Sequence, residues 1–275
     1  MLAQGRTSRF RASNHPPSQQ HHPHEQMPLS RRAVTQLTTM GLLGSSLGWP
    51  AAAISSPRWS YRGKEGPEHW GELSTDYRLC NQGTHQSPID LETLTPTTVK
   101  WSYDYRPSQL TLTHNGHTIR ADSPPGSTLT LENEVFELLQ FHFHDPSEHT
   151  QAQQHQPMEI HFVHRHPQTR ALAVLGVLVK TGPSNIALSQ LWQALPEQVH
   201  QSTSLSQPIS AAQLLPTDST QAFRYRGSLT TPPCSEDVTW LVLANPVTAS
   251  TAQIERFKAL IGTNARPTQQ QPTQR

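Results

Sequence analysis

Two short segments with alternating side chains constrain this chain most. They read Q-F-H-F-H at residues 140–144 and E-I-H-F-V-H at residues 159–164. Successive side chains of a β-strand point to opposite faces, so His142 and His144 share one face and the phenylalanines pack on the other. His161 can reach the same point from a neighbouring strand. Three histidines that leave a fourth position for water are typical of a catalytic zinc site.

A single H-x-H pair would be weak support, because the chain has 16 histidines in 275 residues. The prediction rests on two patterned strands together. Only 15% of the residues are charged, 33% are hydrophobic and 24 are prolines, which favours a loop-rich β protein. From Ile54 onward there are 16 basic and 19 acidic residues, and no cationic stripe. Nucleic acid is therefore not an expected partner.

Residues 1–53 have the pattern of an export signal that is removed near Ala53. Paired arginines at residues 31 and 32 precede a short apolar run at residues 40–49 and three alanines. The run is too short, and too rich in Thr, Ser and Gly, to span a membrane comfortably. The general secretory and twin-arginine routes both remain open, and Met1 and Met27 are both candidate starts. We expect a periplasmic or secreted protein.

The only two cysteines, Cys80 and Cys234, lie beyond this signal. In an oxidising compartment they are expected to form one disulfide, although two separate buried thiols are the alternative. A bond across so long a loop would stabilise the fold by roughly 5 kcal/mol on the chain-entropy model.

Residues 54–275 are expected to form one mainly β domain. The segment at residues 59–70 reads as irregular, a helix is expected at residues 186–194 with Asn185 as its cap, and a second at residues 252–260. The tail from Arg266 is rich in Gln, Pro and Thr and is expected to be frayed. Strands are expected at residues 99–105, 109–113, 118–121, 128–131, 140–144, 159–164, 172–179 and 238–243.

Several further motifs accompany the histidine strands in a fixed order. They are W-S-Y at residues 59–61, G-x-x-Q-S-P-I-D at 83–90, N-G-H at 115–117, S-E-H-T at 147–150 and S-L-T-T-P-P-C at 228–234. Together they make the chain similar to the alpha-class carbonic anhydrases, in particular the exported bacterial members. The resemblance covers about residues 59–269. It implies a single domain built on a large twisted, mostly antiparallel sheet, with zinc at the base of a conical cleft and CO₂ and bicarbonate as substrates.

The resemblance also implies roles for individual residues. His142, His144 and His161 would bind Zn²⁺, with Gln140 and Glu159 orienting the rings of His142 and His161. Zinc would lower the pKa of bound water toward neutrality. Thr230 and Glu148 would orient the resulting hydroxide, and His117 would carry the released proton. Thr231 matches the position beside the substrate, and Tyr61 and Asn115 match the solvent network. The family's hydrophobic wall is matched by Val163, Val174, Leu229, Val238 and Trp240.

Two other classes of protein compete with this interpretation. A cupin-type metal oxygenase also uses three histidines and a glutamate, but the flanking glycine spacing of cupins is missing and T-T-P-P would have no role. A non-catalytic binding relative would have lost a ligand histidine, whereas all three are present. No stable membrane span is expected after signal removal, and a homodimer stays open.

Overall fold

The computed structural model describes residues 57–270. The predicted export signal at residues 1–53 and its cleavage site lie outside the described residues. Within the described part, the strands are β1 Thr97–Thr98, β2 Trp101–Asp104, β3 Thr111–His114, β4 Ile119–Asp122, β5 Thr128–Leu131, β6 Glu134–His144, β7 Thr150–Gln151, β8 Gln154–His155, β9 Met158–Arg165, β10 Leu172–Thr181, β11 Ser202–Ser204, β12 Gln221–Gly227, β13 Val238–Leu243 and β14 Val247–Ala249. The α-helices are α1 Trp70–Leu73, α2 Leu79–Gln82, α3 Ile186–Trp192 and α4 Thr251–Ile261.

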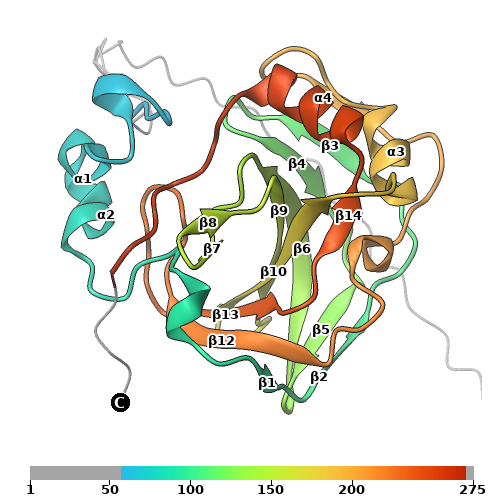
Figure 1. Cartoon of the computed structure of the whole chain (residues 1–275), viewed down its shortest axis with the longest axis horizontal. Helices are drawn as coiled ribbons and strands as arrows, with labels where there is room; N and C mark the ends of the chain where they lie inside the picture. The colour runs from blue at the N-terminus through green and yellow to red at the C-terminus, as the bar shows by residue number, and fades with distance from the viewer. Residues whose placement is uncertain (1–56, 271–275) are drawn as a thin grey trace, which may run out of the picture. The chain divides into compact units, whose positions relative to one another are not determined.

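One large sheet organises residues 57–270 (Figure 1). Its strand order is β1-β12-β13-β10-β9-β6-β4-β3-β11; in addition β5 pairs with β6, β2 pairs with β5, and β14 pairs with β10. Neighbouring strands are antiparallel except where β10 pairs with β13 and with β14. The prediction of a mainly β domain on a large, mostly antiparallel sheet is confirmed.

Strand register brings the histidine segments together. In the β6–β9 pair, His142 lies directly opposite His161, and His144 lies opposite Glu159. Directly opposed residues of antiparallel strands project from the same face at close range. The three histidines therefore converge because of the pairing of two adjacent strands.

A β-bulge in β6 sets which residues face the site. The β6–β9 register shifts between Leu138 and Gln140. Leu138 and Phe141 are three residues apart, so a regular strand would place them on opposite faces. Both nevertheless lie in the main hydrophobic core, which the bulge makes possible.

The two faces of the central strands border different apolar clusters. Phe141, Phe143 and Phe162 lie in the larger cluster, which also contains residues from α3 and α4. Val163 and Val174 lie in a smaller cluster with residues of β12 and β13. Strand β10 is an almost continuous apolar run and is buried along most of its length, as expected of a strand covered on both faces.

Helices α3 and α4 lie close together beside the sheet (Figure 1). The predicted cap of α3 is confirmed, since the Asn185 side chain accepts a hydrogen bond from the Leu188 N–H. Ser250 and Gln253 form a capping box at the start of α4, and the Trp192 indole donates to the Gln253 carbonyl at 2.8 Å. Among residues 57–270, no helix is long and apolar enough to cross a membrane.

The sequence interpretation was wrong or incomplete at several places. The short strands β1, β7, β8, β11 and β14 were not predicted, and β6 begins at Glu134 instead of residue 140. Strand β12 was not predicted, although its burial alternates along much of its length. Trp70, placed in an irregular segment, begins the short helix α1. The tail is not frayed from Arg266, because that side chain is only 1% exposed and the Gln269 N–H donates to the Pro88 carbonyl at 2.7 Å. Long-range hydrogen bonds, which composition does not reveal, fix this segment.

Candidate active site

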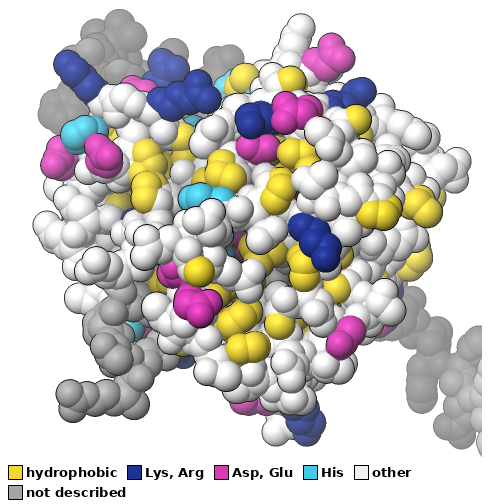
Figure 2. Space-filling view, in the orientation of Figure 1, with side chains coloured by type: hydrophobic (Ala, Val, Ile, Leu, Met, Phe, Trp, Pro, Cys, Tyr) yellow, Lys and Arg dark blue, Asp and Glu magenta, His cyan; other side chains and the backbone are white. Residues whose placement is uncertain are grey.

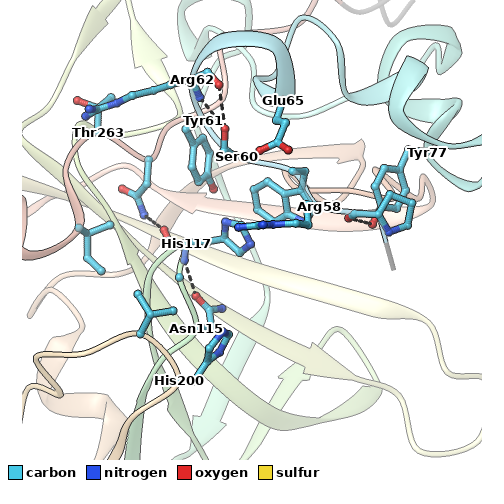
Figure 3. A pocket seen from close by; sticks show the side chains of 16 residues that line it. Arg58, Ser60, Tyr61, Arg62, Glu65, Tyr77, Asn115, His117, His200 and Thr263 are labelled. Carbon is cyan, nitrogen blue, oxygen red and sulfur yellow. Dashed lines mark hydrogen bonds between the residues drawn. The ribbon is translucent and has the colours of Figure 1, made fainter. Parts of the chain in front are cut away.

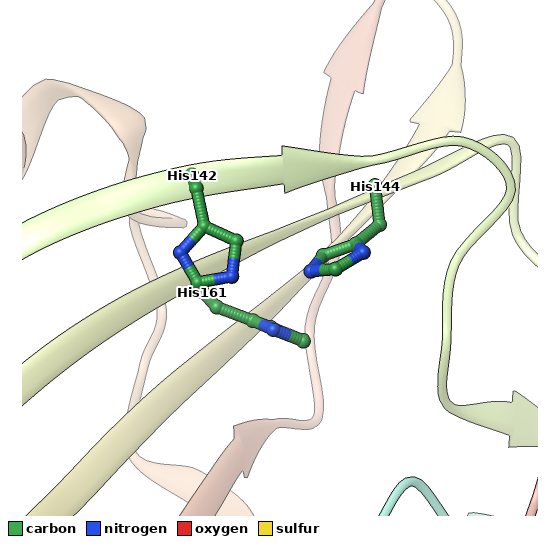
Figure 4. Close-up of side chains that lie close together, drawn as sticks. All are labelled: His142, His144 and His161. Atoms are coloured by element: carbon green, nitrogen blue, oxygen red, sulfur yellow. The ribbon is translucent and has the colours of Figure 1, made fainter. Parts of the chain in front are cut away.

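His142, His144 and His161 form one compact cluster (Figure 4). One ring nitrogen from each lies within 4.8 Å of the others, and His144 and His161 are buried while His142 is half-buried. Figure 4 shows the first two side chains leaving the same strand toward the third. The predicted ligand residues are thus brought together, in a geometry that suits a metal ion.

Each ring has a partner on the nitrogen that faces away from the cluster. The Gln140 side-chain oxygen lies 2.9 Å from His142 Nδ1, and Glu159 Oε1 lies 2.9 Å from His161 Nε2. These are the two orienting residues expected from the sequence. The partner of His144 was missed: its Nδ1 is 2.8 Å from the main-chain oxygen of Asn264. A backbone carbonyl 120 residues away leaves no signal in the sequence.

The donor set fits a metal such as zinc. Nε2 of His144 is buried without a hydrogen-bond partner in the described structure. Leaving a buried polar atom unpaired is costly, so such an atom in a ligand cluster calls for a partner. Burial lowers the pKa of His142 well below its usual value, that of His144 to about 4, and that of His161. The rings are therefore neutral at pH 7, which is the state that binds a metal.

A further buried histidine extends this arrangement. His149 Nδ1 lies 2.7 Å from Glu159 Oε1, and its Nε2 lies 2.7 Å from the Tyr225 hydroxyl. The backbone N–H groups of Glu148 and His149 also donate to Glu159, each at 2.9 Å. Glu159 is thereby held against His161 from several sides. The sequence interpretation did not include His149, because a lone buried histidine reads as ordinary core.

Glu148 lies beside the cluster and is completely buried. Its Oε2 is 3.5 Å from His144 Nε2, and its Oε1 accepts the Arg266 backbone N–H at 2.8 Å. Burial raises the pKa of Glu148 to about 7, while the charge of His161, a hydrogen bond from the Thr230 side chain and that Arg266 N–H lower it. The predicted Thr230–Glu148 pair is present, next to the three histidines.

The expected apolar wall is assembled on the same side. Val163, Val174, Val238 and Trp240 belong to one buried cluster, and the half-buried Leu229 packs against it. The Trp240 ring is edge-on to His161 at 4.9 Å between centroids. Thr231 follows Thr230 in the same loop, and its carbonyl accepts the Cys234 N–H at 2.9 Å. An uncharged, weakly polar molecule suits such a surface.

His117 lies in a separate cavity of about 700 Å³ (Figure 3). Its ring stacks on Trp59 with 3.6 Å between centroids and 6° between planes. Burial lowers the pKa of His117, and the charges of His114 and His200 add to this effect. Tyr61 and Asn115, the two residues expected to belong to a solvent network, line the same cavity.

Asn115 has a clear structural task. Its side-chain oxygen accepts the backbone N–H groups of His117 and Thr118, at 2.9 and 2.8 Å. Gly116 has a φ of +89°, which glycine adopts without strain. The Asn-Gly pair thus builds the turn that presents His117.

The predicted disulfide is present between Cys80 and Cys234. It joins α2 to the loop that carries Thr230, and both cysteines pack with Trp70 and Tyr77.

On the face in Figure 2, basic and acidic side chains are interspersed and no continuous basic patch is visible.

The fold and the site define a mainly β domain with a buried three-histidine cluster in an apolar-walled setting. Residues 65–274 match the family described as eukaryotic-type carbonic anhydrase. A carbonic anhydrase of Nostoc sp. is 42% identical over 254 residues, covering 88% of this chain and 94% of that protein. One of Pectobacterium carotovorum is 41% identical, covering 82% and 92%.

Solved structures agree with these relatives. The alpha-carbonic anhydrase of Thermovibrio ammonificans, in complex with the inhibitor sulfanilamide, superposes with a TM-score of 0.75 at 40% identity, covering 80% of this chain and 97% of that one. The Photobacterium profundum enzyme gives 0.72 at 42%, covering 78% and 97%. The chain therefore belongs to the eukaryotic-type, or alpha, carbonic anhydrase family. It is an enzyme of that family, whose substrates are CO₂ and bicarbonate, and a cupin-type oxygenase is not favoured.

Proposed function

We propose that the chain is a zinc-dependent enzyme that catalyses CO₂ + H₂O ⇌ HCO₃⁻ + H⁺. The observation that carries this proposal is the buried histidine cluster with an unpaired His144 Nε2. His142, His144 and His161 would hold the metal. When bound, zinc lowers the pKa of a water ligand, which makes water a nucleophile near neutral pH.

The partners of the ligand histidines fix the direction of the rings. Gln140 Oε1 and the Asn264 carbonyl each accept from the outward nitrogen of one ring, and Glu159 Oε1 lies 2.9 Å from the outward nitrogen of the third, His161 Nε2. The nitrogens that face the cluster are left as free lone pairs. This arrangement selects one tautomer for each ring before metal arrives.

Thr230 and Glu148 orient the nucleophile. In its ionised form Glu148 only accepts hydrogen bonds, so the Thr230 hydroxyl then donates a hydrogen bond to it. The Thr230 oxygen then has only acceptor capacity toward the cluster. It can accept a hydrogen bond from the attacking oxygen, which aims a lone pair of that oxygen at the substrate carbon.

The apolar wall would bind CO₂ without trapping it. CO₂ carries no charge, so Val163, Val174 and Val238 supply contact but no strong polar attraction. Bicarbonate is charged, and an apolar surface disfavours it relative to water. The same wall therefore favours product release.

His117 would carry the released proton from the cleft to solvent. An unperturbed imidazole titrates close to neutral pH, so it both accepts and releases a proton there, and burial lowers the pKa of His117, which favours release. The turn built by Asn115 and Gly116 places His117 in a cavity of about 700 Å³, which gives it access to solvent. Stacking on Trp59 holds the half-buried ring against one wall of this cavity.

Stopped-flow CO₂ hydration on the mature domain, with zinc quantified in the same sample, tests the proposal. We expect one zinc per chain and hydration that is lost on chelation and restored by zinc. Iron or manganese in the purified protein, together with an absence of hydration, would instead favour a metal oxygenase.

We further propose that the protein is exported and that its signal is cleaved near Ala53. N-terminal sequencing of periplasmic protein would give a terminus close to Ile54, whereas Met1 or Met27 there would refute cleavage. Replacing Arg31 and Arg32 with lysine blocks export if the twin-arginine route is used and leaves the general secretory route intact.

Sedimentation of the mature chain distinguishes a monomer from a homodimer.

A further inference from the structure

Arg266 is a buried cation that the reaction outlined above does not use. Its side chain is 1% exposed, and its guanidinium lies over the Trp70 ring at 5.7 Å from the centroid. It donates to three acceptors: the Gln86 side-chain oxygen at 2.9 Å, the Ser87 carbonyl at 2.8 Å and the Cys80 carbonyl at 2.6 Å. A charge buried this deeply is stable only when such donors are satisfied.

Gln86 continues the connection to the other cysteine. Its side chain is 3% exposed, and its amide nitrogen donates to the Cys234 carbonyl at 3.0 Å and to Glu236 at 3.1 Å. A chain of hydrogen bonds therefore runs from Cys80 through Arg266 and Gln86 to Cys234. It joins the same two residues as the disulfide.

This chain of hydrogen bonds reaches the Thr230 loop from two sides. Cys234 ends that loop, where its N–H donates to the Thr231 carbonyl at 2.9 Å and Leu229 N–H donates to the Ser235 carbonyl at 2.9 Å. On the other side, the Arg266 backbone N–H holds Glu148, the partner of Thr230. Arg266 thus contacts Glu148 directly and reaches the Thr230 loop through Gln86.

We propose that Gln86 and Arg266 are positioning residues whose polar bridge, parallel to the disulfide, keeps the Thr230 loop in register when the disulfide is reduced. The disulfide and the polar bridge are expected to have different effects because they act on different states of the chain. A disulfide stabilises mainly by restricting the unfolded chain, whereas buried hydrogen bonds fix atoms within the native state. This inference rests on the proposed function, because the loop matters only if Thr230 orients the nucleophile.

The experiment compares Cys80→Ser/Cys234→Ser, Gln86→Leu and their combination with the unaltered chain. Two readouts are taken: kcat/KM for CO₂ hydration per bound zinc, and hydrogen exchange of the backbone amides at residues 229–235. Gln82→Leu is the matched control, since Gln82 is exposed and only four residues away. Reducing the folded, unaltered chain with a phosphine checks the double serine variant without requiring it to refold.

The disulfide-free protein is expected to melt at a lower temperature but to keep its kcat/KM and slow exchange in the loop. Gln86→Leu removes the hydrogen bonds to Arg266, the Cys234 carbonyl and Glu236, and is expected to lose about tenfold in kcat/KM at full zinc content, while Gln82→Leu loses nothing. In the combined variant kcat/KM is expected to fall by more than the product of the two separate losses, because neither the disulfide nor the hydrogen-bonded bridge then remains to hold the loop.

Gln86→Glu separates the two halves of the bridge. It keeps an acceptor for Arg266 but has no N–H for the Cys234 carbonyl, so we expect a loss like that of Gln86→Leu. The proposal is overturned if Gln86→Leu retains unaltered kcat/KM and exchange, or if removing the disulfide alone costs as much. An unaltered chain without hydration activity would refute the proposed function, while the exchange data would still test the bridge.

Discussion

The three-histidine cluster and the cavity around His117 position their histidines in different ways. His142 and His161 stand directly opposite each other on paired strands, and their ring partners come from the same two strands. His117 stands on a turn, and its ring stacks on Trp59 from a segment without regular structure. Strand pairing fixes atoms to within narrow limits, which suits metal ligation. A stacked ring on a turn can change position, which suits proton transfer.

The largest expected effect comes from removing a ligand. His161→Ala should leave two histidines, lower zinc affinity by more than the roughly 10–100-fold that loss of a supporting partner costs, and abolish hydration. His155→Ala, an exposed histidine, is the control. Metal content by mass spectrometry and stopped-flow kinetics are the measurements. Normal zinc stoichiometry in His161→Ala would remove this residue from the site.

Removing the hydrogen-bond partner of a ligand histidine should lower zinc affinity less than removing the histidine itself. Gln140→Leu leaves His142 in place but deprives Nδ1 of its acceptor, so zinc affinity should fall about 10–100-fold. Competition with a chelator of known affinity measures this loss. An unchanged affinity would show that strand pairing alone orients the His142 ring, without help from the Gln140 side chain.

At the mouth, His117→Ala should reduce turnover in dilute buffer by up to about 100-fold, the low end of general acid–base contributions. The kcat/KM for CO₂ should stay unchanged, because the attack itself does not involve His117, and added imidazole should restore turnover. His155→Ala, which removes an exposed histidine outside this cavity, is the control. Normal turnover of His117→Ala in dilute buffer would assign the proton to another group.

The smallest effect is expected from Trp59→Ala. Burial is the main cause of the lowered pKa of His117, so opening the stacked face to water should raise that pKa toward 6.5. The pH at which turnover in dilute buffer reaches half its maximum should rise with it, while zinc content stays constant. NMR titration of the His117 ring measures the shift, with Trp101→Ala as a distant control. A pKa that stays unchanged would show that Trp59 does not desolvate the ring.

The sequence predicted the site best where one periodic pattern carried it. Alternation at β6 and β9 predicted which histidines converge, and the structure pairs His142 with His161 accordingly. Thr230 and His117 entered only through the family resemblance, because a threonine in a loop and a histidine on a turn have no periodicity. The Asn264 carbonyl and the buried Arg266 were missed, since both act through contacts more than 100 residues away.

Asn264 touches both regions at once. Its carbonyl faces His144, its side-chain oxygen accepts the Asp145 N–H, and its side-chain nitrogen donates to the carbonyls of His117 and Phe143. During synthesis, the histidine strands emerge well before this residue, which follows His144 by 120 positions. The complete ligand geometry must therefore wait until residue 264 has folded back onto β6. A chain shortened before Asn264 would present the same histidines with one ring unanchored, so we expect a metal ion to bind tightly only at the last stage of folding.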